Sequence, residues 1–169
     1  MLTSTLYNLD THLDGRRNEF ALHYMGRHGP WGTKLQYTRQ VLSPKNPDGA
    51  NQTITVGGLD STYNMATRGN LYLADVSYSV PGAYLWGLVR AVKPYLSYSL
   101  YDKTDPQFHN SQRWILGTSF SLSFLTIYAE WREGRNDPSL GGSSHTQSLA
   151  AGGIDSWRGQ FFMSIAWYF

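Results

Sequence analysis

The amino-acid sequence predicts an all-β protein: an antiparallel up-and-down transmembrane β-barrel with about eight strands, formed as one domain over residues 1–169. Three observations support this prediction. Aromatic residues make up 15% of the chain, with 12 Tyr and 6 Trp. Apolar and polar residues alternate with a period of two in one segment after another. The connections between these segments alternate in length, as they do in bacterial barrels.

The composition excludes several classes of protein. The net charge is only +2, and no basic run with interleaved aromatics is present, so we expect no nucleic-acid partner. Cysteine is absent, which excludes disulfides, thiolate nucleophiles and zinc-thiolate sites. The longest apolar stretch, Ala83–Val89, is far shorter than the roughly 18 residues that a membrane helix needs. A barrel strand avoids this requirement because only alternate residues face lipid.

Four strands are expected in the first half of the chain. A weak strand covers residues 2–8, and a second contains Phe20, Leu22 and Tyr24. The third and fourth are expected over residues 34–41 and 71–80. In the last three, mainly apolar side chains on one face oppose a more polar face, the pattern of a strand whose two faces meet different surroundings.

Four more strands are expected over residues 92–100, 113–122, 124–134 and 160–169. Pro94 is discordant, because proline removes a hydrogen bond from the ladder and is tolerated mainly near the start of a strand. If Pro94 lies within a barrel strand, the register expected there is wrong.

The expected connections fall into two groups. The short ones cover residues 26–31 and 122–124, while residues 9–17 and 103–111 are intermediate. The segments 43–69 and 135–157 are long and rich in Gly, Pro, Asn, Asp and Ser. With a periplasmic C-terminus, the tight turns lie on the periplasmic side and the long loops outside, as bacterial barrels prefer. Residues 81–91 are long for such a turn, and we interpret them as a strand extension or a short interfacial segment.

The C-terminal residues show the strongest alternation. Apolar side chains recur at every second position, at Phe161, Met163, Ile165, Trp167 and Phe169. This ending resembles the C-terminal strand of Gram-negative outer-membrane proteins, whose terminal Phe and alternating apolar residues the insertion machinery recognises. The resemblance implies location in the bacterial outer membrane, a membrane-insertion signal formed by these five residues, and outer-membrane lipid and the barrel-insertion machinery as partners.

The segments LTIYAEWREGRNDPSLGGSS and WRGQFFMSIAWYF resemble the final hairpin of general bacterial porins. Porins of that family commonly have 16 strands and are often trimeric. The chain is therefore expected to be either a complete eight-stranded barrel or the C-terminal half of a larger porin barrel, and it could form a homo-oligomer. The implied function is a channel for passive diffusion of small hydrophilic solutes or ions, with no cofactor and no enzymatic activity.

The alternation also predicts which charged residues face inward. The expected lumen or selectivity residues are Glu19, His23, Lys34, Asp75, Lys93, Arg113, Glu130 and Arg132. Charges inside a barrel must pair or stay hydrated, because desolvating an unpaired charge is costly. We expect Arg113, Glu130 and Arg132 to form one network. Two interpretations remain open: a constriction that selects solutes by charge, or a plug of salt bridges in a closed barrel.

Two other functions are alternatives to a channel. A small closed barrel could have a structural or adhesion role, with the external loops 43–69 and 135–157 as its contact surface. A lipid-modifying enzyme would need a nucleophile and an oriented base. Ser143, Ser144 and His145 share one loop and cannot meet that geometry by themselves, while His23 lies in a strand.

Metal binding is not expected. Asn46, Asp48 and Asn51 could offer oxygen ligands to calcium, but they lack the spacing of a calcium loop. We expect them to form a turn instead.

Overall fold

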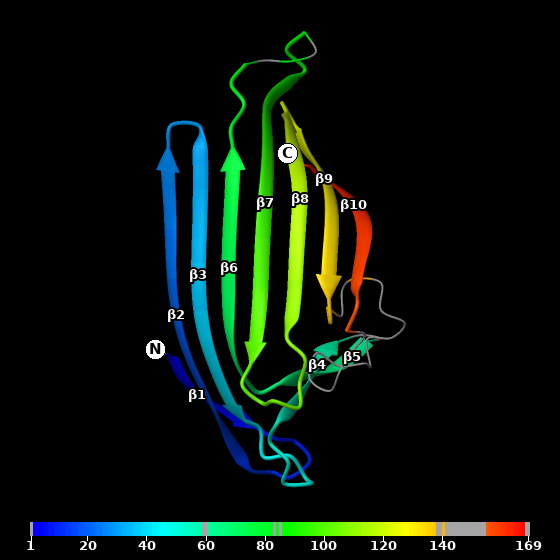
Figure 1. Cartoon of the computed structure of the whole chain (residues 1–169). Helices are drawn as coiled ribbons and strands as arrows, with labels where there is room; N and C mark the ends of the chain where they lie inside the picture. The colour runs from blue at the N-terminus through cyan, green and yellow to red at the C-terminus, as the bar shows by residue number, and fades with distance from the viewer. Residues whose placement is uncertain are drawn as a thin grey trace.

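The computed structural model describes residues 2–58, 61–82, 84, 86–137, 140 and 155–167. Eight antiparallel strands form one sheet in the order β1-β2-β3-β6-β7-β8-β9-β10, and β4 and β5 form a separate hairpin (Figure 1). The strands are β1 Leu2–Tyr7, β2 Asp14–His28, β3 Trp31–Ser43, β4 Thr53–Gly58, β5 Ser61–Ala66, β6 Arg68–Tyr78, β7 Val89–Lys103, β8 Ser111–Leu122, β9 Leu125–Arg135 and β10 Trp157–Trp167. The all-β, antiparallel, up-and-down part of the prediction is confirmed, and all eight expected strands are present.

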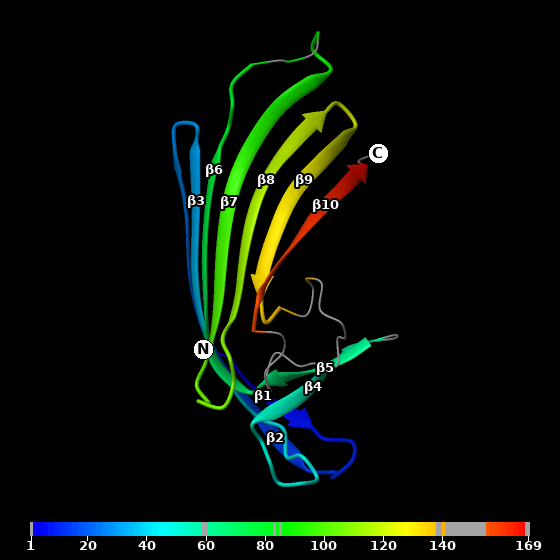
Figure 2. The same ribbon diagram turned by 45° about the vertical axis from the view of Figure 1, so that its right-hand side comes forward.

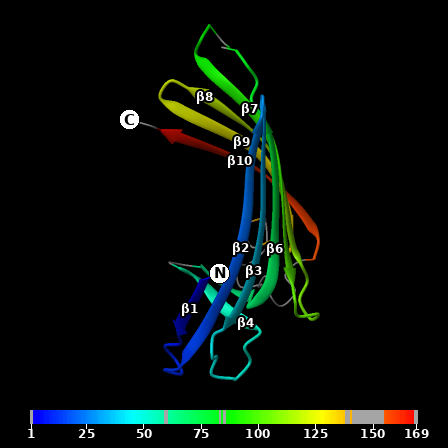
Figure 3. The same ribbon diagram turned by 90° about the vertical axis from the view of Figure 1, so that its left-hand side faces the viewer.

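The sheet is twisted and curved, but it does not close into a barrel. Figure 2 shows β7 to β10 bending away from the direction of β3, and in Figure 3 β10 runs at a steep angle to β2. In the described part of the chain, β1 pairs only with β2, and β10 pairs only with β9. The expected closure of these strands into a barrel is therefore wrong for the chain as it stands, because the first and last strands do not meet. Within the described ranges no helix is both long and apolar enough to cross a membrane.

The connections differ sharply between the two ends of the sheet. At one end, short links join β2 to β3 through Gly29 and Pro30 and β8 to β9 through Ser123 and Phe124. The remaining connections lie at the opposite end, with the exception of the long link between β6 and β7 (Figure 1). We refer to these as the turn end and the loop end. The predicted asymmetry of the connections is thus present.

The link from β6 to β7 is the exception at the turn end. It contains single bridges between Val80 and Val92 and between Tyr84 and Val89, so it partly extends the sheet. Trp86 adopts φ +55° and is fully exposed at its tip. The bridges agree with the interpretation of this segment as a strand extension, and its interpretation as a short interfacial segment stays a prediction.

Pro94 lies inside β7 without disturbing the register. Pro94 pairs with Thr118 of β8. On the other side of β7, the continuous pairing with β6 includes Tyr95, the next residue, but not Pro94. Val92 then makes a single bridge to Val80. Proline therefore occupies a gap in the ladder on its β6 side, where a missing N–H has little cost. The expectation that an internal Pro94 would invalidate the register is wrong for this reason.

The hairpin of β4 and β5 was not predicted, since residues 43–69 were expected to be loop. Thr53 pairs with Ala66 and Thr55 with Asn64, and the hairpin projects from the loop end of the sheet (Figure 1). Thr67 joins the hairpin to the sheet: its N–H donates to Gln52 O at 2.9 Å, and its carbonyl accepts from Leu42 N at 2.8 Å.

Candidate functional site

The register of the sheet gives it one polar and one apolar face. Directly opposed residues share a face, so the pairings can be followed from strand to strand. His23 opposes Gln36, Lys34 opposes Asp75, and Asp75 opposes Ser97. Ser99 opposes Arg113, and Arg132 opposes Gln160. The eight residues expected in a lumen, Glu19, His23, Lys34, Asp75, Lys93, Arg113, Glu130 and Arg132, all lie on this polar face.

The opposite face is apolar and unusually exposed. Leu22 is 63% exposed, Leu116 62% and Phe161 61%. On the polar face, by contrast, Ser77 and Ser119 are buried. A protein that folds in water places its large apolar side chains inside. Here they remain exposed on one face of the sheet, and an apolar surface of this extent is typical of contact with a partner or a membrane.

Among the residues that the register pairs, the apolar face carries no Asp, Glu, Lys or Arg along the turn-end part of its strands, while Arg90 lies at the register irregularity of β7 without a paired residue. In β7 it runs from Val92 to Leu100, and in β8 from Trp114 to Leu122. These segments match the roughly 9–11 residues with which a tilted strand crosses a bilayer. The charged residues of this face all lie toward the loop end: Asp14, Arg16, Arg39, Arg68, Asp102, Glu133 and Arg135.

The expected insertion signal lies on the apolar face as far as it is described. Phe161, Met163, Ile165 and Trp167 oppose Trp131, Ala129, Ile127 and Leu125 of β9. All four C-terminal residues are exposed. The fifth residue, Phe169, lies outside the described residues. Whether these residues act as an insertion signal stays a prediction.

Three strands contribute to a polar cluster in the middle of the polar face. Tyr95 of β7 donates a hydrogen bond to Glu130 of β9. The other carboxylate oxygen of Glu130 accepts from Arg132 Nε at 2.6 Å. The guanidinium of Arg132 lies 3.7 Å from the ring centroid of Phe162 of β10. Glu130 is only 11% exposed, so its charge depends on this pairing and on the tyrosine hydroxyl.

Gly117 of β8 lets Tyr95 reach across the intervening strand. Gly117 lies between Tyr95 and Glu130 in the register. A Cβ atom at Gly117 would lie 2.5 Å from the ring of Tyr95, closer than real contacts allow. The glycine therefore provides the space over which the tyrosine ring lies.

The expected network of Arg113, Glu130 and Arg132 forms only in part. Glu130 and Arg132 pair directly, with Arg132 Nη2 at 2.5 Å from the carboxylate. Arg113 instead makes a two-pronged contact with Asp137, with Nη2 to Oδ1 at 2.7 Å. Asp137 follows the end of β9 and folds back over Gly134, which stands opposite Arg113 in the register. Arg113 therefore anchors the loop end and does not join the central pair.

The remaining expected lumen residues differ in their contacts. Glu19 pairs with Arg17 at 2.8 Å, and Asp75 accepts a hydrogen bond from Ser97 Oγ at 2.6 Å. His23, Lys34 and Lys93 are exposed, and none of them forms an ion pair with a residue in the described part of the chain. The face thus combines internally paired charges with exposed basic groups.

Asp155 ties the ends of β9 and β10 together at the loop end. Its carboxylate accepts from Arg135 Nε at 2.6 Å and from Nη2 at 2.8 Å, and His109 Nδ1 lies 3.5 Å away. The hydrogen bonds from Arg135 hold the pKa of Asp155 below its ordinary value, with a weaker attraction from His109 and Lys103. This contact closes the base of the connection between the two strands.

Replacing Asp155 by Asn should give a pH-dependent loss of stability. Because the pKa of Asp155 is lowered by folding, its stabilising contribution is present above the ordinary carboxyl pKa of about 4 and disappears as the pH falls through the lowered value. Urea midpoints of the wild type and D155N should differ by a constant, small amount between about pH 5 and 7 and converge at lower pH. D10N, which changes an exposed turn carboxylate without an ion pair, is the control. Equal midpoints at neutral pH would contradict the prediction.

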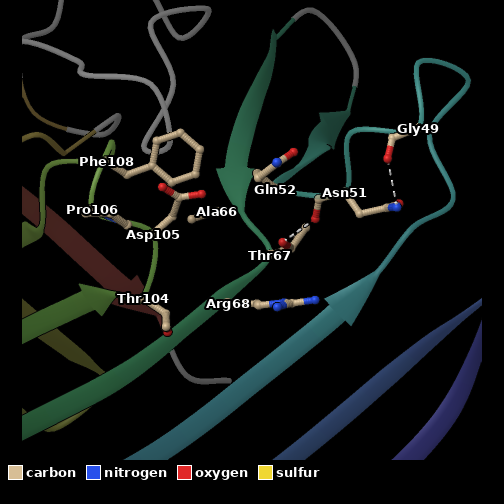
Figure 4. Close-up of a pocket in the computed structure, with 10 residues that line it drawn as sticks. All are labelled: Gly49, Asn51, Gln52, Ala66, Thr67, Arg68, Thr104, Asp105, Pro106 and Phe108. Atoms are coloured by element: carbon tan, nitrogen blue, oxygen red, sulfur yellow. Dashed lines mark hydrogen bonds between the residues drawn. The ribbon is translucent and has the colours of Figure 1, made fainter.

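The loop end also contains a polar pocket of about 470 Å³ (Figure 4). It lies between the β4–β5 hairpin and the connection from β7 to β8, and Arg68, Asp105 and Phe108 contribute to its lining. Asn51 is held in place by an Nδ2 bond to Gly49 O at 3.2 Å and by Thr67 Oγ1, which donates to Asn51 O at 2.6 Å.

The residues weighed for calcium form a turn, as expected. Asp48 Oδ1 accepts from Ala50 N, while Asn51 Oδ1 accepts from Lys45 N at 2.7 Å. Across the described residues, no group of three or more His, Asp or Glu could hold a metal ion. Ser143, Ser144 and His145 lie outside the described residues.

Sequence reasoning missed several members of the polar face. Tyr95, Arg17, Arg27 and Arg158 share it. The alternation over residues 92–100 could have found Tyr95, whereas the three arginines lie outside the strands expected from the sequence. The contact of Asp137 with Arg113 has no such signal, because Asp137 lies beyond a strand. The chain matches no protein-family model, no curated protein and no solved structure.

Proposed function

We propose that the chain forms part of the wall of an outer-membrane pore, through which small hydrophilic solutes or ions diffuse passively. The apolar face contacts lipid in this proposal, and the polar face lines the aqueous path. The observation that carries it is the exposed, charge-free part of the apolar face, which lies directly behind a face rich in charged and hydroxyl groups. Membrane barrels have this inverted arrangement of polarity.

The aromatic residues of the apolar face fit the same orientation. Near the turn end, Trp31 packs on Tyr78 with ring centroids 4.8 Å apart, and Phe124 packs on Trp167 at 5.4 Å. Nearer the loop end, Tyr98 packs on Trp114 at 4.3 Å. Aromatic side chains of this kind favour the two boundaries between hydrocarbon and water. The aromatic pairs near the turn end and the pair nearer the loop end therefore support a membrane-spanning part of the sheet that lies between them.

The open edges bear on how such a pore would be completed. Among the residues that the structure describes, β2 has no partner on the β1 side beyond Glu19, and β10 has none beyond β9. In hydrocarbon, every unpaired backbone N–H and C=O costs several kcal/mol. Eight strands closed on themselves would also fill their interior with side chains. We therefore propose that strands of further copies of this chain pair with both edges and widen the barrel.

Single-channel recording tests this function. The full chain is refolded in detergent, its β-structure is verified by circular dichroism, and it is added to a planar lipid bilayer. Stable, stepwise conductance is the expected result. A folded, heat-resistant β-protein that inserts into vesicles without any conductance would contradict the pore.

That second outcome would favour a structural or adhesion role for the loop end. The observation in its favour is the pocket between the β4–β5 hairpin and the β7–β8 connection, with Arg68 and Asp105 among its lining residues (Figure 4). A lipid-modifying activity has no comparable support in the described residues, where His23 is exposed on the polar face without an ion pair.

A further inference from the structure

Basic side chains outnumber acidic ones on the polar face of the eight-stranded sheet. The register places eight basic residues there: Arg17, Arg27, Lys34, Lys93, Lys103, Arg113, Arg132 and Arg158. It places only three acidic residues there: Glu19, Asp75 and Glu130. The net charge of the whole chain, +2, conceals this imbalance.

Each of the three carboxylates already has a partner. Glu19 pairs with Arg17 at 2.8 Å, and Glu130 accepts from both Arg132 and Tyr95. Asp75 accepts from Ser97 Oγ at 2.6 Å. Groups of the protein itself therefore partly screen the negative charges of the face, which leaves few carboxylate oxygens free to bind a passing cation.

The basic residues near the turn end are in the opposite situation. Arg27, Lys34 and Lys93 are exposed, and none forms an ion pair with any residue that the structure describes. Asp75, which opposes Lys34 in the register, is the one acidic residue of the polar face in this part of the described sheet. At the loop end of the same face, by contrast, Asp137 pairs with Arg113 and Glu19 pairs with Arg17. The uncompensated positive charge is thus concentrated toward the turn end.

An aqueous path lined by one sign of charge concentrates ions of the other sign. Rings of Lys and Arg side chains are the usual means by which pores prefer anions. Exposed ammonium groups are in contact with water and can exchange it for a passing anion. Lys34 of β3 and Lys93 of β7 lie on separate strands of the curved sheet, so both would border the same path.

We propose that the pore prefers small anions over cations, and that Lys34 and Lys93 set this preference. The inference rests on the proposed pore function, since without an aqueous path the polar face selects nothing. The solute class is that of small inorganic or carboxylate anions, and chloride is the probe.

The test is the reversal potential of the full chain in a planar bilayer that separates two KCl concentrations. The reversal potential of the wild type should shift from zero toward the equilibrium potential of chloride, with chloride severalfold more permeant than potassium. The double variant K34Q/K93Q should lower this permeability ratio at least twofold, and K34E/K93E should invert the preference. R39Q removes one exposed positive charge from the apolar face, half the change in net charge of K34Q/K93Q, and its ratio should equal that of the wild type.

The possible failures are distinguishable. Absence of conductance in the wild type would refute the pore and this inference together. Conductance with a preference for potassium would leave the pore standing and refute the anion preference. An anion preference that K34Q/K93Q leaves unchanged, or that R39Q reduces equally, would refute the role of the two lysines. Circular dichroism of each variant excludes a folding defect as the cause.

Discussion

Replacing Leu22 by Arg should lower the free energy of unfolding from a lipid bilayer by about 2–4 kcal/mol, the cost of arginine near the midplane on the lipid side of a barrel. Leu22 is 63% exposed on the apolar face, midway along β2, and opposes Tyr37. In water, the same change at so exposed a position would cost little. The measurement is urea unfolding of the protein folded into lipid vesicles.

Ala21 provides a matched control for this substitution. It is the neighbouring residue, it is also exposed, and it opposes Thr38 on the polar face. A21R should therefore change stability by less than about 1 kcal/mol, because the new side chain enters the aqueous path. If L22R and A21R destabilise the protein equally, the apolar face does not contact lipid.

Removing the carboxylate of Glu130 should destabilise the sheet by about 3 kcal/mol, the lower end of the range for breaking a buried ion pair from one side. The variant E130A leaves Arg132 only 27% exposed and without its partner, and it leaves the hydroxyl of Tyr95 without its acceptor. The value lies at the lower end because Arg132 keeps some access to water and its contact with Phe162. Urea unfolding of the wild type and the variant in vesicles measures it.

Two further variants make this result specific. E130Q keeps an acceptor for Tyr95 while it removes the charge, so it should lose less stability than E130A. E133A removes a carboxylate from the same strand, but at an exposed position on the other face. It should change stability by less than about 0.5 kcal/mol. Similar losses for E130A and E133A would show that the cluster adds nothing to stability.

The strands and their faces could be predicted because the signal is local. Each strand shows its alternation within its own residues, and Leu22 and His23 point to opposite faces in any register that keeps the pleat. The eight expected lumen residues share a face for this reason. Their function as a lumen remains a prediction, since it depends on what surrounds the sheet.

Features that depend on distant residues were harder to predict. The closure of the sheet is not a property of any strand, and alternation cannot show whether β1 and β10 meet. The partner of Arg113 is Asp137, which folds back from beyond β9 over Gly134. The hairpin of β4 and β5 had a local signal in the β-branched run from Thr53 to Val56, but the polar, Gly-rich surroundings hid it.

The β4–β5 hairpin has a consequence for how the chain folds. All neighbouring strands of the large sheet are also neighbours in sequence, except β3 and β6. Joining these two requires closure of a longer loop, and the entropy cost rises with loop length. The hairpin replaces one long loop closure by two shorter ones. Once Thr53 pairs with Ala66, Gln52 and Thr67 are brought together, and Thr67 O then accepts from Leu42 N at the start of the β3–β6 contact. The meander can therefore form as a succession of short closures, with low contact order throughout.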